Sequence, residues 1–198
     1  MSTTIEPRRV QTATKSDEEN LLAVLTLAFS TDPGLRWYFT TSSQFYTHFP
    51  AFSRAYGGKA FDHDAAYFVG EYAGAALWLP PDVHPDNDGI ENVMQAALSA
   101  EKFALMGEFI ERLEKSHPDE PFWELALLGV DPTQQRKGYG SLLLEPVLTA
   151  CDREGTPAFL ISSNVQNLSL YLRNGFEIVD TIQLPTMPPF VPMRRDPQ

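Results

Sequence analysis

The loop over residues 135–141 combines the residue types and spacing that best suit binding of a phosphate group. It follows an apolar run at Trp123–Val130 and leads through Gly138 and Gly140 into an apolar helical pattern. The first amides of a helix have no partners inside the helix and carry a partial positive charge. Glycine lets an anion approach such amides without a side chain in the way. The stretch is therefore predicted to bind a diphosphate.

Two other kinds of glycine loop do not fit these residues. A dinucleotide fingerprint needs a third glycine at the position that Leu143 occupies. The nucleoside-triphosphate loop needs the pattern G-x-x-x-x-G-K-[ST], which this chain lacks. What remains is Gln135-x-x-Gly138-x-Gly140, placed behind the Val130-Asp-Pro end of the apolar run.

This glycine loop and a second motif downstream resemble the GNAT superfamily of N-acetyltransferases. The loop is similar to the acetyl-CoA-binding motif of that superfamily. Asn164, Tyr171 and the pair Gly175-Phe176 are similar to its N…YxxxGF signature, and Asn164 precedes Tyr171 by the common spacing of seven residues. The resemblance covers residues 123–195.

The resemblance implies an α/β fold with a mixed, largely antiparallel sheet and helices on both faces. The strands over Trp123–Val130 and Ala158–Ser162 would run parallel and splay apart around the cofactor. It also implies acetyl-CoA as co-substrate, no metal, and direct transfer of the acetyl group to a primary amine in a ternary complex. We expect a small-molecule amine. Two alternatives stay open: acetylation of a protein lysine or N-terminus, and a non-catalytic module that binds acetyl-CoA.

The resemblance places the cofactor contacts along three segments. Backbone groups of Leu128, Gly129 and Val130 are expected to pair with the pantetheine amides. The pyrophosphate is expected on the loop formed by Gln135, Arg136, Lys137, Gly138, Tyr139, Gly140 and Ser141, where the two cations add charge. Asn164 and Asn167 complete the expected set. Asn164 has a second interpretation as a helix N-cap, and the two roles can coexist.

Tyr171 and Glu124 are the candidates for proton transfer. A phenol with a reference pKa of about 10 keeps its proton at neutral pH, so Tyr171 can protonate the leaving thiolate. Its alternative role is packing beside the pantetheine arm. Glu124 lies in an otherwise apolar strand, where burial should raise its pKa, and it is predicted to act as general base through water. The alternative is a strand-end carboxylate that faces solvent or pairs with an arginine.

Four further residues, Glu71, Tyr72, His84 and Glu120, are weaker candidates for amine recognition.

Some segments resemble the puromycin N-acetyltransferase-like branch of the superfamily. The similar stretches start at Leu127, Leu143, Pro157 and Met193. That branch often carries a glutamate in a Leu-Glu-Thr-Ser run, whereas residues 160–163 here read Leu-Ile-Ser-Ser. The substrate of the branch is therefore not transferred to this chain.

Composition narrows the classes of protein. The 198 residues are 43% hydrophobic and carry a formal net charge of −11, which suits one domain over residues 1–198 and disfavours a nucleic-acid partner. The acidity favours solubility or, more sharply, an acidic cleft that attracts a cationic amine. No apolar run approaches the roughly 18–20 residues of a membrane span.

Cysteine and histidine usage sets further expectations. One cysteine, Cys151, forbids an internal disulfide, and residues 1–10 have no apolar core of a secretion signal. We therefore expect a cytoplasmic monomer or homodimer. The histidines show no metal-ligand spacing, and Cys151 is expected on the core face of a helix.

The elements that must position these residues follow from periodicity and turn signals. Strands are predicted at residues 10–13, 65–69, 73–79, Trp123–Val130, Ala158–Ser162, 176–183 and Val191–Arg195. Helices are predicted from residue 16 or 17 to 29, and over residues 42–56, 90–115 in two segments, 138–153 and 167–174. Asp32-Pro33-Gly34 is interpreted as a helix stop. Residues 14–117 would form the acceptor side.

Overall fold

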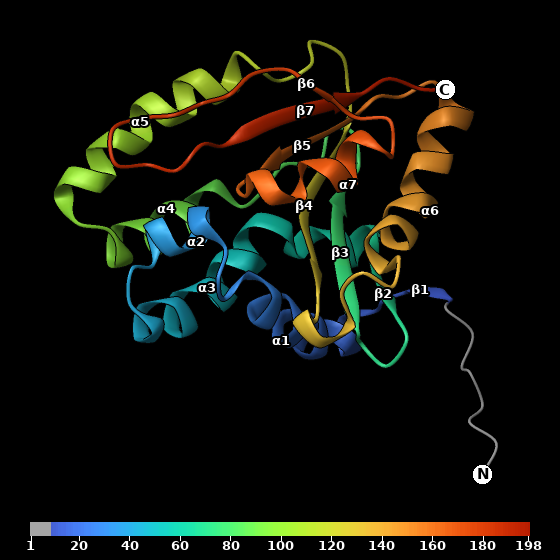
Figure 1. The fold of residues 1–198 in the computed structure, drawn as a ribbon, viewed down its shortest axis with the longest axis horizontal. Helices are drawn as coiled ribbons and strands as arrows, with labels where there is room; N and C mark the ends of the chain where they lie inside the picture. The colour runs from blue at the N-terminus through green and yellow to red at the C-terminus, as the bar shows by residue number, and fades with distance from the viewer. Residues whose placement is uncertain (1–8) are drawn as a thin grey trace.

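A mixed seven-stranded sheet organises the computed structural model, which describes residues 9–198 (Figure 1). The spatial order is β1-β2-β3-β4-β5-β7-β6, and among these described strands only β4 and β5 pair in parallel. The strands are β1 (Val10–Thr12), β2 (Ala66–Val69), β3 (Gly74–Leu79), β4 (Trp123–Val130), β5 (Ala158–Ser162), β6 (Glu177–Ile178) and β7 (Val191–Arg195). This arrangement confirms the predicted mixed α/β sheet.

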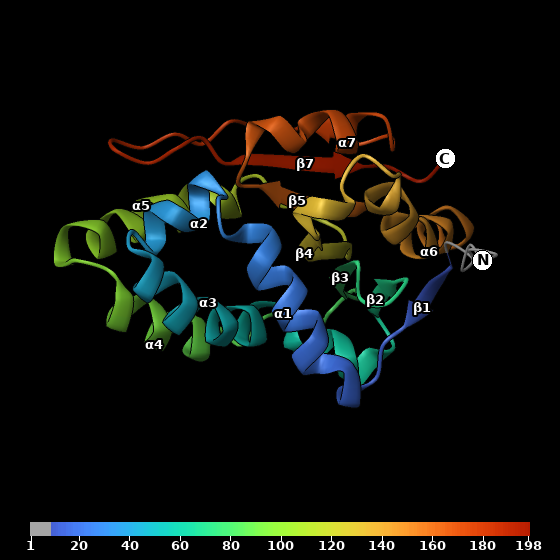
Figure 2. The same cartoon turned by 60° about the horizontal axis from the view of Figure 1, so that its bottom comes forward.

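Seven α-helices among the described residues surround the sheet (Figure 2). They are α1 (Glu18–Phe29), α2 (Pro33–Tyr38), α3 (Ser42–Gly57), α4 (Asn87–Ala97), α5 (Ala100–Glu114), α6 (Tyr139–Glu154) and α7 (Leu168–Leu172). The two faces can be told apart at the paired strands β3 and β4. A side chain on Gly129 would meet Ala28 of α1, whereas one on Gly74 would meet Leu143 of α6. Gly74 and Gly129 belong to neighbouring pairs of the β3–β4 register, whose side chains point to opposite faces of the sheet. α1 and α6 therefore lie on opposite faces, as predicted.

The buried core lies between these helices and the sheet. It includes Leu21 and Leu25 of α1, Phe45 and Phe49 of α3, and Leu144 of α6, all fully enclosed. The helical apolar spacing of these segments predicted the same faces, because residues three or four apart line one side of a helix.

Two predicted boundaries are wrong. Asp32-Pro33-Gly34 begins a helix rather than ending one: the Asp32 side chain accepts a hydrogen bond from the Leu35 amide at 3.0 Å, and Pro33 occupies the first turn. The strand predicted over residues 176–183 shrinks to the two residues of β6 and an isolated bridge between Ile182 and Phe190. β6 lies at the sheet edge, where strands are often short.

Two expectations concern membranes and secretion. Among residues 9–198, no helix is both long and apolar enough to cross a bilayer. The interpretation of residues 1–10 as lacking a secretion signal rests mainly on residues 1–8, which lie outside the described range.

Candidate active site

The parallel strands β4 and β5 separate part of the way along their length. They pair at Trp123 with Ala158, Glu124 with Phe159, and Leu125 with Leu160, and no pair follows although β4 continues to Val130. This confirms the predicted splay. Backbone groups of β4 beyond Leu125 thus have partners on the β3 side but none from β5, and such groups need a partner from elsewhere.

Amide orientation decides which β4 residues face this opening. The Asp131 amide donates to the Ala73 carbonyl at 2.9 Å, on the β3 side. The backbone N–H and C=O groups of successive residues in a strand point to alternate sides. Those of Gly129 therefore also point to β3, while those of Leu128 and Val130 point into the opening. The expected backbone role of Gly129 is therefore corrected: a Cβ there would lie 2.8 Å from the Ala28 Cβ, so the glycine serves close packing of α1.

The start of α6 offers free amides at the wide end of the opening. Gly138 precedes the helix without any side-chain cap, and the first helical bond is donated by Leu142 to the Gly138 carbonyl at 3.1 Å. The φ angles of Arg136 and Gly138 are +61° and +86°, and left-handed residues in such a turn make anion-binding concavities. A Cβ on Gly138 would meet nothing within 4 Å. The loop therefore fits a diphosphate.

Side chains of the loop stabilise its shape. The Gln135 amide donates to the Val130 carbonyl at 3.3 Å, and the Lys137 ammonium donates to Gln134 at 2.7 Å. Arg136 and Lys137 are exposed. Tyr139 and Ser141 are partly buried in the first turn of α6, and Ser141 accepts a bond from Asn174 at 3.1 Å that ties α6 to the end of α7.

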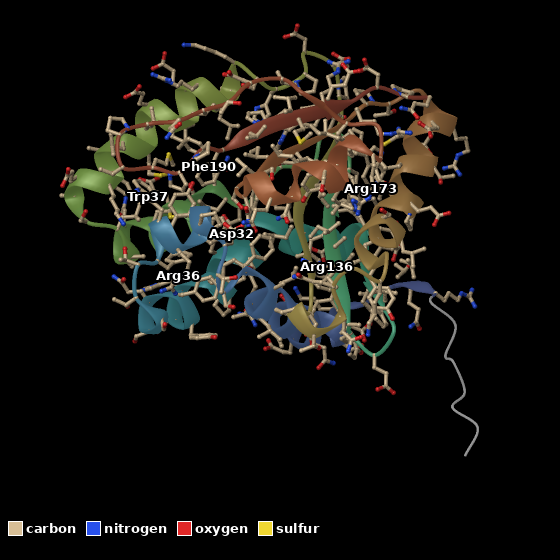
Figure 3. The ribbon with its side chains drawn as sticks, viewed as in Figure 1. Asp32, Arg36, Trp37, Arg136, Arg173 and Phe190 are labelled. Atoms are coloured by element: carbon tan, nitrogen blue, oxygen red, sulfur yellow. The ribbon has the colours of Figure 1, made fainter. Side chains whose placement is uncertain are left out.

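A groove of about 790 Å³ continues from this loop along α6. Lys137, Gly138 and Ser141 line it on one side, and Arg173 lines it on the other. Arg173 is exposed and, like Arg136, stands outside the core (Figure 3). The sequence analysis missed Arg173, although its place inside the Tyr171–Phe176 motif is a usable signal. Glu145 of α6 also lines the groove, so the groove is of mixed charge. Arg173 is the cation that it adds beside the diphosphate loop, where it would suit a further phosphate of a nucleotide.

Tyr171 is buried on α7 and packs edge-on against Phe176, with ring centroids 6.0 Å apart. Burial raises the pKa of the Tyr171 phenol, and the charge of Asp32 raises it further. The phenol thus holds its proton at neutral pH. Asn164 does cap a turn, since its side chain accepts from the Gln166 amide at 3.0 Å. Its side-chain NH₂ group is separate from this bond, so the cap and a cofactor contact remain compatible.

Glu124 lies at the narrow end of the opening. Its carboxylate accepts a hydrogen bond from the Tyr56 hydroxyl at 2.9 Å. Burial raises the pKa of Glu124, while the Tyr56 bond and the nearby His84 oppose that rise. The ion pairs among residues 9–198 do not include Glu124, so the alternative of an arginine pair is wrong. A carboxylate with a raised pKa suits proton acceptance near neutral pH.

Asp32 is a candidate that the sequence analysis missed. It is 5% exposed and accepts from the Leu35 amide and from the Ser163 hydroxyl, each at 3.0 Å. Ser163 directly follows β5, so Asp32 lies where β5 leaves the opening (Figure 3). Burial raises the pKa of Asp32.

Of the weaker candidates for amine recognition, His84 lies near Glu124, whereas Tyr72 and Glu120 bond to residues elsewhere. Tyr72 donates to Asp17 at 2.7 Å, and Glu120 pairs with Arg194. Burial raises the pKa of the Cys151 thiol to about 12, as suits a core residue. Within the described residues, no group of three or more His, Cys, Asp or Glu is placed to hold a metal ion.

Comparisons with known proteins agree with this geometry. Residues 94–197 match the sequence profile of the acetyltransferase (GNAT) domain. An uncharacterized N-acetyltransferase of Schizosaccharomyces pombe is 32% identical over 130 residues, which is 59% of this chain; the aligned part spans only 52% of that relative.

Two solved structures share the fold over almost the whole chain. One is described as histone acetyltransferase HPA2 and related acetyltransferase from Corynebacterium glutamicum, with 21% identity, a TM-score of 0.70 and 96% coverage of both chains. The other is arylalkylamine N-acetyltransferase 2 from Aedes aegypti, with 14% identity, a TM-score of 0.65, and coverage of 96% of this chain and 99% of that one. The puromycin-like branch stays a prediction. Because the GNAT domain profile matches more than half of the residues, the chain belongs to the GNAT acetyltransferase family.

Proposed function

We propose that this acetyltransferase transfers the acetyl group of acetyl-CoA to the primary amine of a small molecule in a ternary complex. The observation that carries the proposal is the opening between β4 and β5, which ends at an uncapped helix start. Acetyl-CoA supplies an activated thioester and a diphosphate. The free amides of Tyr139, Gly140 and Ser141 would hold that diphosphate, and the backbone of Leu128 and Val130 would bind the pantetheine arm.

Three steps fall to residues of the chain. Glu124, through a water molecule, takes the proton from the arriving ammonium, which frees the nitrogen lone pair for attack on the thioester carbonyl. A backbone amide at Leu128 or Val130 polarises the carbonyl oxygen. Tyr171 then donates its phenol proton to the leaving thiolate as the carbon–sulfur bond breaks. The nitrogen loses its second proton as the amide forms, and this proton returns through water to the Tyr171 phenolate, while Glu124 releases its proton to solvent. The products are therefore the amide, free coenzyme A thiol and one proton.

The preference for a small amine rests on the helices of the acceptor side. α2, α3, α4 and α5 extend to one side of the opening in Figure 2. Aromatic residues gather there, and Phe190 packs against Tyr38 and Phe109 with ring centroids 5.8 and 5.0 Å apart. An acceptor side that is covered by helices and rich in aromatic residues suits binding of a small amine better than binding of a protein chain. The arylalkylamine substrate named for the Aedes aegypti neighbour belongs to this class.

The test measures thiol release from acetyl-CoA with a panel of primary amines. Tyr171→Phe should lower kcat by about 100-fold, the usual scale of lost acid catalysis, without changing the affinity for coenzyme A in calorimetry. Tyr46→Phe, on an exposed tyrosine, is the matched control. Full turnover in Tyr171→Phe would remove the acid assignment. A wild-type chain that neither binds coenzyme A nor acetylates any amine would overturn the proposal.

A further inference from the structure

Asp32 is a buried carboxylate without a cation. No ion pair among residues 9–198 includes it. Its partners, the Leu35 and Gly34 amides and the Ser163 hydroxyl, are neutral donors. Buried charges in proteins are normally paired because an isolated charge is costly to desolvate. Such a site is therefore better satisfied by a positive group that comes from outside the chain.

The position of Asp32 fits the acceptor side of the proposed reaction. The first turn of α2 presses against the end of β5, since a Cβ on Gly34 would lie 2.7 Å from the Ser163 Cβ. Ser163 is followed by the segment that carries Tyr171, and the charge of Asp32 acts on the Tyr171 phenol. A group bound at Asp32 is thus within electrostatic reach of the proposed acid, beside the opening.

We propose that Asp32 is the specificity-determining residue that binds the acceptor as an ammonium ion, so that the substrates are aliphatic primary amines that are cationic at neutral pH. This inference rests on the proposed function. A protonated amine supplies the missing counter-charge and a donor for the carboxylate lone pair that Gly34, Leu35 and Ser163 leave free. The net charge of −11 draws such cations toward the molecule.

Asp32 also caps α2, and the test must separate that role from its charge. Asparagine keeps an oxygen that can accept from the Leu35 amide but removes the charge, so Asp32→Asn should fold. Asp86→Asn is a matched control, because Asp86 is an exposed cap that accepts from the Gly89 amide at 3.1 Å. Both variants are assayed at saturating acetyl-CoA with an alkylamine and with an aromatic amine that is uncharged at neutral pH.

We expect Asp32→Asn to raise the KM for the alkylamine about tenfold or more, the scale of a lost charged hydrogen bond. The KM for the uncharged aromatic amine, the affinity for coenzyme A and the melting temperature should change little. Asp86→Asn should leave both KM values unchanged. Equal KM changes for the two amines, or none, would overturn the role of Asp32 while leaving the acetyltransferase proposal intact. Absence of turnover in the wild-type protein would instead overturn the proposed function.

A second measurement covers the case in which Asp32→Asn does not fold. A quaternary ammonium compound and its uncharged tert-butyl isostere are compared as competitive inhibitors of the wild-type enzyme against the alkylamine. The account predicts that the cation inhibits at about one tenth of the concentration of the isostere. Equal inhibition would contradict an anionic binding residue.

Discussion

Two sets of acidic residues, Asp152 on one hand and Asp32 with Glu124 on the other, differ in their hydrogen-bond partners. Asp152 forms a two-pronged pair with Arg195, at 2.7 and 2.9 Å, and also accepts from the Gln198 amide at 2.8 Å. Arg195 is 4% exposed and donates its Nε–H to the Asn174 carbonyl at 3.0 Å. Asp32 and Glu124 receive only neutral donors in the described part of the chain.

This difference in partners separates a carboxylate that stabilises the fold from carboxylates that suit a reaction. The Arg195 guanidinium lowers the pKa of Asp152, whereas burial raises the pKa of Asp32 and of Glu124. The Asp152–Arg195 pair and the bond from Arg195 to Asn174 connect β7 to α6 and to the end of α7. Asp32 and Glu124 are destabilised in their charged form, so they suit proton transfer or the binding of a cation. Asp32 and Glu124, which form no ion pair within residues 9–198, therefore lie beside the opening where acetyl transfer is proposed.

The largest expected effect is on catalysis by Glu124→Gln. Glutamine can still accept the Tyr56 hydrogen bond but cannot take a proton, so kcat should fall by about 100- to 1000-fold. The free energy of unfolding should stay equal or rise, because a desolvated charge is lost. Assays of thiol release measure kcat, and urea unfolding measures the free energy of unfolding. Retained turnover with an unchanged pH profile would show that Glu124 is not the base.

Breaking the paired set should affect stability rather than catalysis. Asp152→Asn leaves the buried Arg195 without its counter-charge, and we expect a loss of about 3 kcal/mol in the free energy of unfolding. Urea unfolding measures the loss, with Asp62→Asn on the exposed surface as control. If Asp152→Asn lowered the free energy of unfolding no more than the control does, the Asp152–Arg195 pair would not stabilise the fold. The proposed difference between Asp152 and the pair Asp32 and Glu124 would then be wrong.

Acid titration sharpens the same contrast. The folded pKa of Asp152 is depressed, so its contribution is complete above its unfolded pKa of about 3.9 and is lost as pH falls through the folded value. The folded pKa values of Asp32 and Glu124 are raised, so lowering the pH through those values relieves a cost instead. The stability difference between wild type and Asp152→Asn should therefore shrink only below about pH 4. A difference that already vanishes near pH 6 would contradict this assignment.

The smallest expected effect concerns Cys151. The thiol is buried on α6 and its pKa is raised to about 12, so a thiol reagent should react only after unfolding. Labelling in native buffer and in denaturant, followed by intact mass, measures this. Rapid native labelling would show that this part of the core opens readily.

Sequence alone predicted the part of the site that is local in the chain. The apolar run at β4, the glycines at the start of α6 and the Tyr171 motif lie within one β-α-β-α stretch, so turn and helix rules suffice. Glu124 was proposed as a base because a charge interrupts an apolar strand. The splay of β4 from β5 was predicted only through the family resemblance.

The missed parts depend on contacts between distant residues. Asp32 and Ser163 are 131 positions apart, and Asp-Pro-Gly is typical of a turn as well as of a helix start. Nothing local shows that this aspartate is buried. The role of Gly129 was misassigned for a similar reason, since its close contact with Ala28 of α1 is tertiary.

A crystal structure of the protein with coenzyme A bound tests the central claim most directly. The account predicts the diphosphate on the amides of Tyr139, Gly140 and Ser141, the pantetheine arm between β4 and β5, and the thiol on the side of the opening that Glu124 and Tyr171 flank. A nucleotide bound elsewhere, with these amides in contact only with water or with side chains of the protein, would contradict it.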